Sequence, residues 1–406
     1  MLKDINSSKG KKILIYSPYY HPEPFPINTF VDELAERESI KEIKVITSLP
    51  NYRNYKFYNG YSILGPYKEK KNKIKIIRLP VIPRSSNSGF SIFLFYLSSF
   101  FSSTIFLFFF SIFNRNKYDH ILTFCGSPVL VGYIGFVASK ILNSQSSQWI
   151  QDIWPEAIET TIGIKNKILK SLILKLQNYM WKLSDILFCE SESLSRYLKK
   201  NYEDLKIITL YNPIRTESSY INDNKKLSKD KMKFSYIGNM GKAQNIEMII
   251  RCFQKANIKD SILNMCGDGS LLIPLSNKYK NNKIKWHGWL SGNNLEKIYL
   301  ESDFFILSLQ SIGRQGLIIP SKLQSYFMNR KPIVCISTGA VRDLIKEVNA
   351  GITCDEINED NTTEMFKKAS ELSEKDKLIM SENSYHYYQK HFTKKNIVNT
   401  FLENII

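Results

Sequence analysis

Short runs of β-branched and apolar residues alternate with longer helical patterns along almost the whole chain, and this alternation limits the possible folds most. Parallel strands need crossover connections of about a dozen residues or more, usually a helix, so the pattern predicts parallel sheets covered by helices. In the first half we expect strands at 11–17, 43–48, 73–80, 120–125, 147–153, 186–191 and 206–212, with helices at 27–37, 129–142 and 165–183.

The same pattern begins again after a polar, charged segment at 216–233 and gives strands at 233–239, 261–267, 283–288, 304–310, 332–337 and 351–355. A chain of 406 residues is too long for one core. The predicted fold class is therefore α/β, with two Rossmann-like, doubly wound parallel-sheet domains. The predicted parts are a first domain at 1–213, a linker at 214–232, a second domain at 233–380, and a helical segment at 381–406 that crosses back to the first domain.

Basic residues outnumber acidic ones, 56 to 38, which gives a formal charge of +18 and predicts an anionic partner. Nucleic acid, phosphorylated substrates and an anionic membrane leaflet all fit such an excess. Nucleic-acid binding would need lysines and arginines gathered on one helix or stripe, and here they are scattered through both halves. The six cysteines lie singly, as in reduced cytoplasmic proteins, and the N-terminus has too short an apolar run for a signal peptide.

The stretch 89–114 has no charged residue and is long enough to cross a bilayer. A single crossing would place the strands on its two sides, at 73–80 and 120–125, on opposite faces of the membrane, although both belong to one predicted sheet. Two interpretations stay open. The stretch is either a helix pair that is partly buried in the domain and partly dips into one leaflet, which makes the protein peripheral (monotopic) at the inner face of the cytoplasmic membrane, or a wholly internal helix.

Ligands of open α/β sheets bind at the carboxyl ends of the strands, where three loops of the second half are unusual. The first contains Gly238 and Gly241 with Lys242, and the second contains Gly267, Asp268 and Gly269. Glycines there let backbone N–H groups approach a phosphate closely. The third begins a helix, which favours anions at its N-terminus, with Pro320 expected in the first turn, followed by Ser321 and Lys322.

Several motifs are missing. The sequence has no G-x-G-x-x-G after the first strand, no G-x-x-x-x-G-K-[ST] and no G-x-S-x-G, which argues against a nicotinamide enzyme, a P-loop ATPase and a hydrolase of the nucleophile-elbow type. The five histidines have no metal-ligand spacing, and no D-x-D pair occurs. We therefore expect neither a metal nor a cofactor.

One loop of the first half combines Asp152, Trp154 and Glu156 directly after a strand. A tryptophan ring can pack on the apolar face of a sugar while carboxylates accept its hydroxyls. The alternative is an ordinary helix start with acidic residues in its first turn.

With these loops placed, the chain resembles family 4 glycosyltransferases of the GT-B architecture, in which two Rossmann-like domains face each other across a cleft. Within this family it is similar to the subgroup that includes the bacterial L-fucosamine-type transferases of surface-polysaccharide assembly. The resemblance covers nearly the whole chain. It is carried by YYHPEPFPINTFVDELAER, VITSLPNYRNYKFYNGY, GSPVLVG, QDIWPEAI, YIGNMGKAQNIE, CGDGS and IPSKLQSYFMNRKPIV.

The resemblance implies metal-independent, retaining transfer of a sugar from a nucleotide diphosphate, UDP being the expected nucleotide, with the acceptor held by the first domain. Lys242 and Lys322 would stabilise the leaving diphosphate, while Asp152 and Glu156 would orient the acceptor. Glu23, Asn28 and Trp154 are the further acceptor-binding candidates. The donor-binding candidates are Gly238, Asn239, Gly241, Gln244, Gly267, Asp268, Gly288, Trp289, Arg314, Pro320, Ser321, Gln324 and Ser325.

The chain departs from the wider family at four of the matched positions. Asn239 and Gln244 stand where many members have an arginine and a lysine, and Leu317 and Ser325 replace two glutamates. The second glutamate is usually a ribose ligand, for which Gln324 is the expected substitute. The resemblance implies a lipid-linked saccharide as acceptor, in capsule, O-antigen or exopolysaccharide synthesis. A nucleotide-sugar epimerase on the same architecture stays open as the alternative, and it would turn over donor without acceptor.

Overall fold

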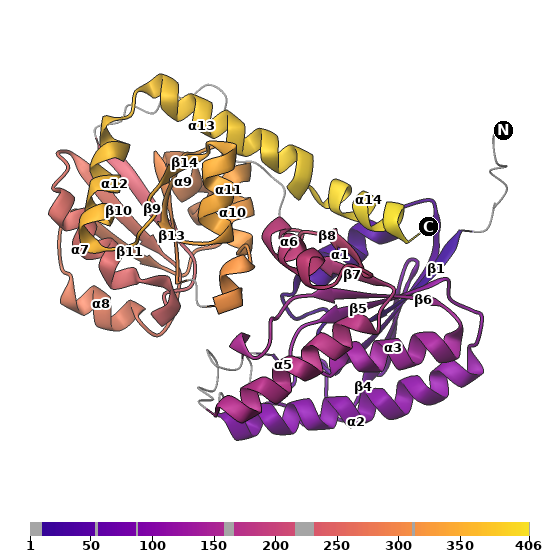
Figure 1. Cartoon of the computed structure of the whole chain (residues 1–406). Helices are drawn as coiled ribbons and strands as arrows, with labels where there is room; N and C mark the ends of the chain where they lie inside the picture. Colours follow the sequence, from indigo (N-terminus) through magenta and orange to yellow (C-terminus); the bar gives the residue numbers. More distant parts are fainter. Residues whose placement is uncertain are drawn as a thin grey trace, which may run out of the picture. The chain divides into compact units, whose positions relative to one another are not determined.

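The computed structural model describes residues 10–52, 56–86, 88–157, 166–215, 231–310 and 313–405. The chain forms two compact units: unit 1 consists of Met1–Arg215 and Lys394–Ile406, and unit 2 of Thr216–Thr393 (Figure 1). Most of the predicted linker 214–232 lies outside the described residues.

Unit 1 is built on a sheet of eight strands in the order β3-β4-β2-β1-β5-β6-β7-β8. All neighbours are parallel except β3 and β4, and the seven predicted strands are confirmed. β3 has the charged sequence KEKK and was not predicted, because it forms a strand only by pairing with the sheet edge. The strands are β1 (Lys11–Tyr16), β2 (Ile40–Ser48), β3 (Lys68–Lys71), β4 (Ile74–Leu79), β5 (His120–Cys125), β6 (Gln145–Ile150), β7 (Ile186–Cys189) and β8 (Lys206–Thr209).

Helices join these strands, and Figure 1 shows α2, α3 and α5 together along one side of the sheet. The C-terminal helix α14 packs on α1 instead, where the rings of Phe30 and Phe401 lie 5.1 Å apart. The segment that belongs to unit 1 begins at Lys394, rather than at residue 381 as predicted. The helices of unit 1 are α1 (Pro26–Ala35), α2 (Gly89–Phe113), α3 (Val131–Leu142), α5 (Lys167–Lys182), α6 (Glu192–Asn201) and α14 (Lys394–Asn404).

The apolar stretch 89–114 forms the single long helix α2, rather than the predicted helix pair, because no glycine or proline interrupts it after Gly89, and α2 lies against α3 and β4. Its buried face repeats every four residues and contains Ser91, Phe95, Ser99, Ser103, Leu107 and Ser111. In the described part of the chain α2 is the one helix long and apolar enough to cross a membrane, and 28% of its most apolar segment is buried. The helix is thus neither wholly internal nor wholly exposed, because small serines allow close packing on one face while phenylalanines cover the other.

Unit 2 contains six parallel strands in the order β11-β10-β9-β12-β13-β14, and all six were predicted. The strands are β9 (Met232–Ile237), β10 (Ser261–Cys266), β11 (Ile284–Gly288), β12 (Phe304–Leu309), β13 (Ile333–Ser337) and β14 (Gly351–Thr353). The helices are α7 (Ile246–Ala256), α8 (Leu272–Lys278), α9 (Gly292–Glu301), α10 (Ser321–Met328), α11 (Ala340–Val348), α12 (Glu359–Glu371) and α13 (Glu374–Tyr387).

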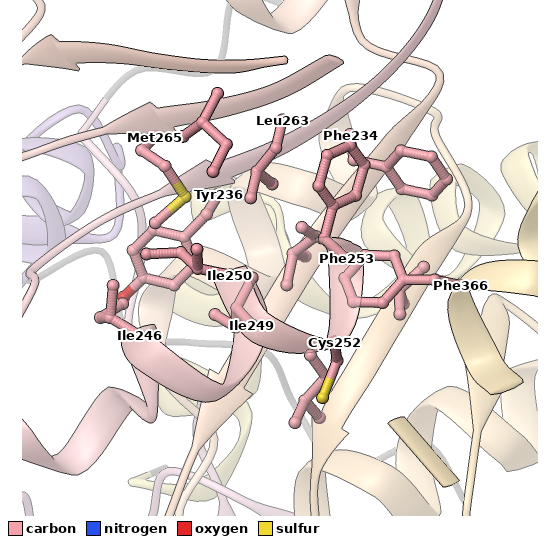
Figure 2. Packing of buried hydrophobic residues seen from close by; sticks show 14 of the residues in the cluster. Phe234, Tyr236, Ile246, Ile249, Ile250, Cys252, Phe253, Leu263, Met265 and Phe366 are labelled. Atoms are coloured by element: carbon pink, nitrogen blue, oxygen red, sulfur yellow. The ribbon is translucent and has the colours of Figure 1, made fainter. Parts of the chain in front are cut away.

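The core of unit 2 lies between the sheet and the helices α7 and α12, as Figure 2 shows. Phe234 on β9 meets Phe253 on α7 and Phe366 on α12, with ring centroids 5.9 and 5.4 Å away. All three side chains are almost completely buried. Their packing fixes β9 in the middle of the sheet, and β9 leads directly into the first glycine loop.

Candidate functional site

The glycine loops after β9 and β10 pack against each other at the carboxyl edge of the unit 2 sheet. The N–H of Gly238 donates to Cys266 O (2.9 Å), and that of Gly267 donates to Gly288 O (2.7 Å). A Cβ on Gly267 would lie 1.8 Å from Gly238 O, and the φ of Gly267 is +135°. Only glycine fits at this position, so the close approach of the loops depends on it.

Two residues predicted to meet the donor, Asn239 and Gln244, instead hold the first loop together. Gln244 Oε1 accepts hydrogen bonds from Gly241 N (3.0 Å) and Asn239 Nδ2 (3.3 Å). Lys242 begins the short 3₁₀ helix η1 (Lys242–Gln244) and is exposed. Lys242 therefore remains accessible for an anionic ligand, while Gln244 is used within the loop.

Lys322 is half-buried, although a lysine in the first turn of a helix is ordinarily exposed. Its Nζ donates to Ser308 O (3.2 Å) and Tyr236 Oη (3.4 Å), and it lies 4.9 Å from the centroid of the Tyr236 ring. It comes within 3.9 Å of the position that a Cβ on Gly238 would occupy. Burial lowers the pKa of the Lys322 ammonium to about 8. No carboxylate of the described residues forms an ion pair with it.

The start of α10 also differs from the prediction. Pro320 is the N-cap, with extended φ and ψ of −70° and 142°, and Ser321 is the first helical residue. Lys322 still lies in the first turn, where free backbone N–H groups favour an anion. Gln324, the expected ribose ligand, is 2% exposed and its Oε1 has no hydrogen-bond partner among the described residues. Burial therefore keeps Gln324 from a ligand in this conformation, whereas the neighbouring Ser325 is half-buried.

The remaining donor candidates lie on the second loop, at the end of β11 and on η2 (Gly313–Leu317). Asp268 Oδ1 accepts the N–H of Gly269 (2.7 Å), which stabilises the turn. Gly288 ends β11 with a φ of +64° and is followed by Trp289, which is 76% exposed. Arg314 is half-buried in η2. An exposed tryptophan at a ligand-binding sheet edge is suited to stacking on a planar ring.

In unit 1, Asp152 lies at the carboxyl edge of the sheet, where its Oδ2 accepts a hydrogen bond from Ser127 Oγ (2.7 Å). Burial raises the pKa of this carboxyl group. Trp154 is 7% exposed and donates its backbone N–H to Gln177 Oε1 (2.7 Å). The prediction of Trp154 as an open platform for a sugar is therefore wrong. Glu156 is half-buried, near the end of this described segment at residue 157.

Glu23 and Asn28 were predicted to bind the acceptor, but both are buried. Glu23 Oε1 accepts the N–H groups of Asn51 (2.9 Å) and Tyr52 (2.8 Å), and Asn28 Nδ2 donates to Glu23 O (2.6 Å). Burial raises the pKa of Glu23 to about 7, although its backbone hydrogen bonds oppose the rise. The carboxylate of Glu23 thus connects two loops of unit 1. This structural role accounts for Glu23 without any bound ligand.

Sequence reasoning missed Glu190 and Asn212, which follow β7 and β8 at the same sheet edge as Asp152. Asn212 Nδ2 donates to Glu190 Oε2 (2.6 Å) and Gln151 Oε1 (2.8 Å). Burial, together with the charge of Asp152, raises the pKa of Glu190 well above its usual range. The rule that polar residues after each strand meet at one edge would have found them, had it been applied beyond β6. Among the described residues, no three His, Cys, Asp or Glu side chains are grouped as a metal site would require.

Comparisons with known proteins bear on this arrangement. Residues 219–387, within unit 2, match the family model of glycosyl transferases group 1. No curated protein is similar enough in sequence to count as a relative. Among solved structures, Anabaena Alr3699/HepE in complex with UDP matches with a TM-score of 0.66 at 10% identity, covering 97% of this chain and 99% of that one.

Two further structures match over the full length. Sucrose-phosphate synthase from Thermosynechococcus elongatus has a TM-score of 0.67 at 13% identity, over 97% of this chain and 98% of that one. WaaG, a glycosyltransferase involved in lipopolysaccharide biosynthesis, has a TM-score of 0.62 at 11% identity, over 97% and 99%. The chain has the GT-B fold, as predicted, and the family match with this fold supports a group 1 glycosyltransferase. Identities this low establish the fold but no particular substrate.

Proposed function

We propose that the chain is a retaining, metal-independent glycosyltransferase that moves a sugar from a UDP-sugar to a lipid-linked saccharide. The observation that carries this proposal is the half-buried Lys322 ammonium, which lies at the start of α10 beside Gly238 and has no carboxylate partner in the described residues. A buried charge of this kind is unfavourable unless a ligand compensates it. The diphosphate of a nucleotide sugar supplies that compensation.

Binding of the donor would use the carboxyl edge of the unit 2 sheet. The diphosphate would lie against the glycine loops after β9 and β10 and accept N–H groups from the first turn of α10, while Lys322 and the exposed Lys242 supply positive charge. Trp289 would lie beside the base. That Anabaena HepE has been solved with UDP and with UDP-glucose supports a nucleotide sugar as the ligand of this fold.

The transfer step needs negative charge to be stabilised on the leaving group. The bond between the anomeric carbon and the diphosphate oxygen breaks, and the acceptor oxygen bonds to the same face of the sugar. The acceptor proton passes to the leaving diphosphate. Lys242 and Lys322 stabilise the charge as it develops, which is how preorganised donors lower a barrier. Asp152 and Glu156 in unit 1 would orient the acceptor hydroxyl.

The exposed face of α2 supports a lipid-linked acceptor. It carries Phe90, Phe101, Ile105, Phe109 and Phe113, whose exposed fractions range from 55% to 75%. The first turns of α5 add Ile168 and Leu172, at 74% and 58%. An apolar face of this length beside exposed lysines, in a chain of net charge +18, fits shallow insertion into an anionic leaflet. The protein would then be peripheral at the inner face of the cytoplasmic membrane.

Sugar transfer with isolated components tests the proposal. The purified chain is incubated in EDTA with bacterial membranes and a panel of radiolabelled nucleotide sugars, and label is counted in the lipid-soluble fraction. We expect one UDP-linked N-acetylated amino or deoxyamino hexose to label the lipid fraction. Donor turnover that proceeds equally without membranes would favour the epimerase, and the absence of both transfer and turnover would contradict the proposal.

A further inference from the structure

Polar side chains follow four neighbouring strands of the unit 1 sheet. Ser127 comes after β5, Asp152 after β6, Glu190 directly after β7, and Asn212 after β8. Because these strands are parallel, all four residues lie at the carboxyl edge, where open α/β sheets bind their ligands. These four strand ends therefore offer carboxyl, amide and hydroxyl groups.

The amide of Asn212 joins three of these strand ends. Its two hydrogens are both used, one bonded to Glu190 Oε2 at 2.6 Å and the other to Gln151 Oε1 at 2.8 Å. Two polar atoms of the same network are left over. Gln151 Nε2 and Asn212 Oδ1 are shielded from solvent and have no hydrogen-bond partner among the described residues.

The two leftover atoms are one donor and one acceptor. Buried polar groups nearly always have partners, so this pair calls for a group that can both accept and donate. A hydroxyl group does both, whereas a phosphate only accepts and an ammonium only donates. Gln151 and Asn212 are themselves only half-buried, so other parts of these side chains reach solvent, and a small side-chain rotation would bring the two shielded atoms to a ligand.

The charges at this edge also select against an anion. Asp152 and Glu190 interact electrostatically, and neither forms an ion pair with a cation in the described part of the chain. Burial raises the pKa of both carboxyl groups, and the charge of Asp152 adds to the rise at Glu190, so the pair retains a proton more readily than isolated acids. A diphosphate would be repelled here, and neutral sugar hydroxyls would not.

We propose that Gln151 and Asn212 bind a hydroxyl group of the acceptor saccharide, and that Glu190 is the positioning residue that holds the Asn212 amide. This inference rests on the proposed function and names part of the acceptor subsite in unit 1. Asp152 and Ser127 lie at the adjoining strand ends. The subsite therefore recognises hydroxyl groups through amides, without a stacking tryptophan.

Two variants and one control test the subsite. Asn212→Leu removes the amide at similar size, and Glu190→Gln keeps an oxygen that can accept from Asn212. Asp185→Asn is the control, because Asp185 accepts hydrogen bonds from Ser146 at the opposite edge of the same sheet. Each protein is assayed for transfer with increasing amounts of a chloroform–methanol extract of lipid-linked saccharides, for UDP binding by calorimetry, and for melting temperature.

We expect Asn212→Leu to raise the half-saturating amount of acceptor about tenfold, the effect of roughly one lost hydrogen bond to a ligand. Glu190→Gln should raise it less, about threefold, and Asp185→Asn should leave it unchanged. UDP affinity should stay the same in all three. If Asn212→Leu lowers the melting temperature but saturates with the same amount of acceptor as the control, the network only stabilises the strand ends. That result would overturn the proposal.

The behaviour of the wild type shows whether the proposed transferase function itself has failed, separately from the acceptor subsite. If the wild type binds UDP but transfers no sugar, saturation-transfer NMR with free N-acetylglucosamine at millimolar concentration decides the subsite alone. Signals that are present with wild type, retained with Asp185→Asn and lost with Asn212→Leu would support a sugar-hydroxyl site without transferase activity. Absence of signals with the wild type would overturn it.

Discussion

Replacing Lys322 by methionine should make the protein more stable at neutral pH. The pKa of this lysine falls from the ordinary 10.5 to about 8 in the folded chain. At about 1.4 kcal/mol per pH unit, the charged form lowers the free energy of unfolding by roughly 3 kcal/mol, an upper value because the folded state can relax around the charge. A methionine side chain at this position would keep a similar length and remove this penalty.

The direction of this pKa shift determines how the stabilisation by Lys322→Met depends on pH. A folded-state pKa below the unfolded one means that folding expels a proton, so the penalty is complete below pH 8 and disappears as the pH rises toward 10.5. The difference between Lys322→Met and the wild type should therefore be largest at about pH 7 and smaller at about pH 9.5. Urea unfolding of both proteins at these two pH values, in a buffer without phosphate, measures this difference in the free energy of unfolding.

Lys280→Met provides a matched control, since Lys280 is exposed in the same unit. Its free energy of unfolding should change by less than about 0.5 kcal/mol, as for most surface substitutions. A Lys322→Met variant that is less stable than the wild type at neutral pH by more than about 1 kcal/mol would refute the reasoning. The ammonium would then be a structural donor to Ser308 O and Tyr236 Oη rather than an uncompensated charge.

Two further predictions concern the membrane and the glycine loops. The double substitution Phe101→Ser and Phe109→Ser should release the protein from floated anionic vesicles. Leu378→Ser on α13, which also replaces an exposed apolar side chain, should not release it. If both variants bind the vesicles equally well, the exposed face of α2 does not contact lipid. Gly267→Ala should lower the free energy of unfolding by at least about 2 kcal/mol, because its Cβ would lie 1.8 Å from Gly238 O. Gly292→Ala, which has open space around the new Cβ, should lower it by about 1 kcal/mol or less. Similar values for the two variants in denaturant titrations would contradict the described packing of the loops.

Periodicity was sufficient to predict the sheets of both units, because buried parallel strands require continuous apolar runs such as KKILIY and HILTFC. β3 was missed because a charged KEKK segment becomes a strand only through an edge partner. The helix α12 was missed as well, since its polar sequence buries Met365 and Phe366 against α7 only in the folded unit.

The site was harder to predict, because burial depends on tertiary packing. The sequence suggested that Lys322 and Trp154 contact ligands directly, but neighbouring elements of the fold cover these side chains. Glu190 and Asn212 each follow an ordinary strand and have no motif, and only the parallel pairing of β6, β7 and β8 brings them together. The apolar stretch 89–114 left two interpretations open because serines and apolar residues at every fourth position suit a buried face but leave the opposite face undecided.

The most direct measurement of the central claim is the affinity for UDP in EDTA, by calorimetry, with wild type and Lys322→Met. If the ammonium beside Gly238 compensates the diphosphate, wild type binds UDP without a metal and the variant binds at least about thirtyfold more weakly, as for the loss of a charge-assisted hydrogen bond. Equal affinity of the two proteins, or binding by wild type that appears only on addition of a divalent cation, would contradict it.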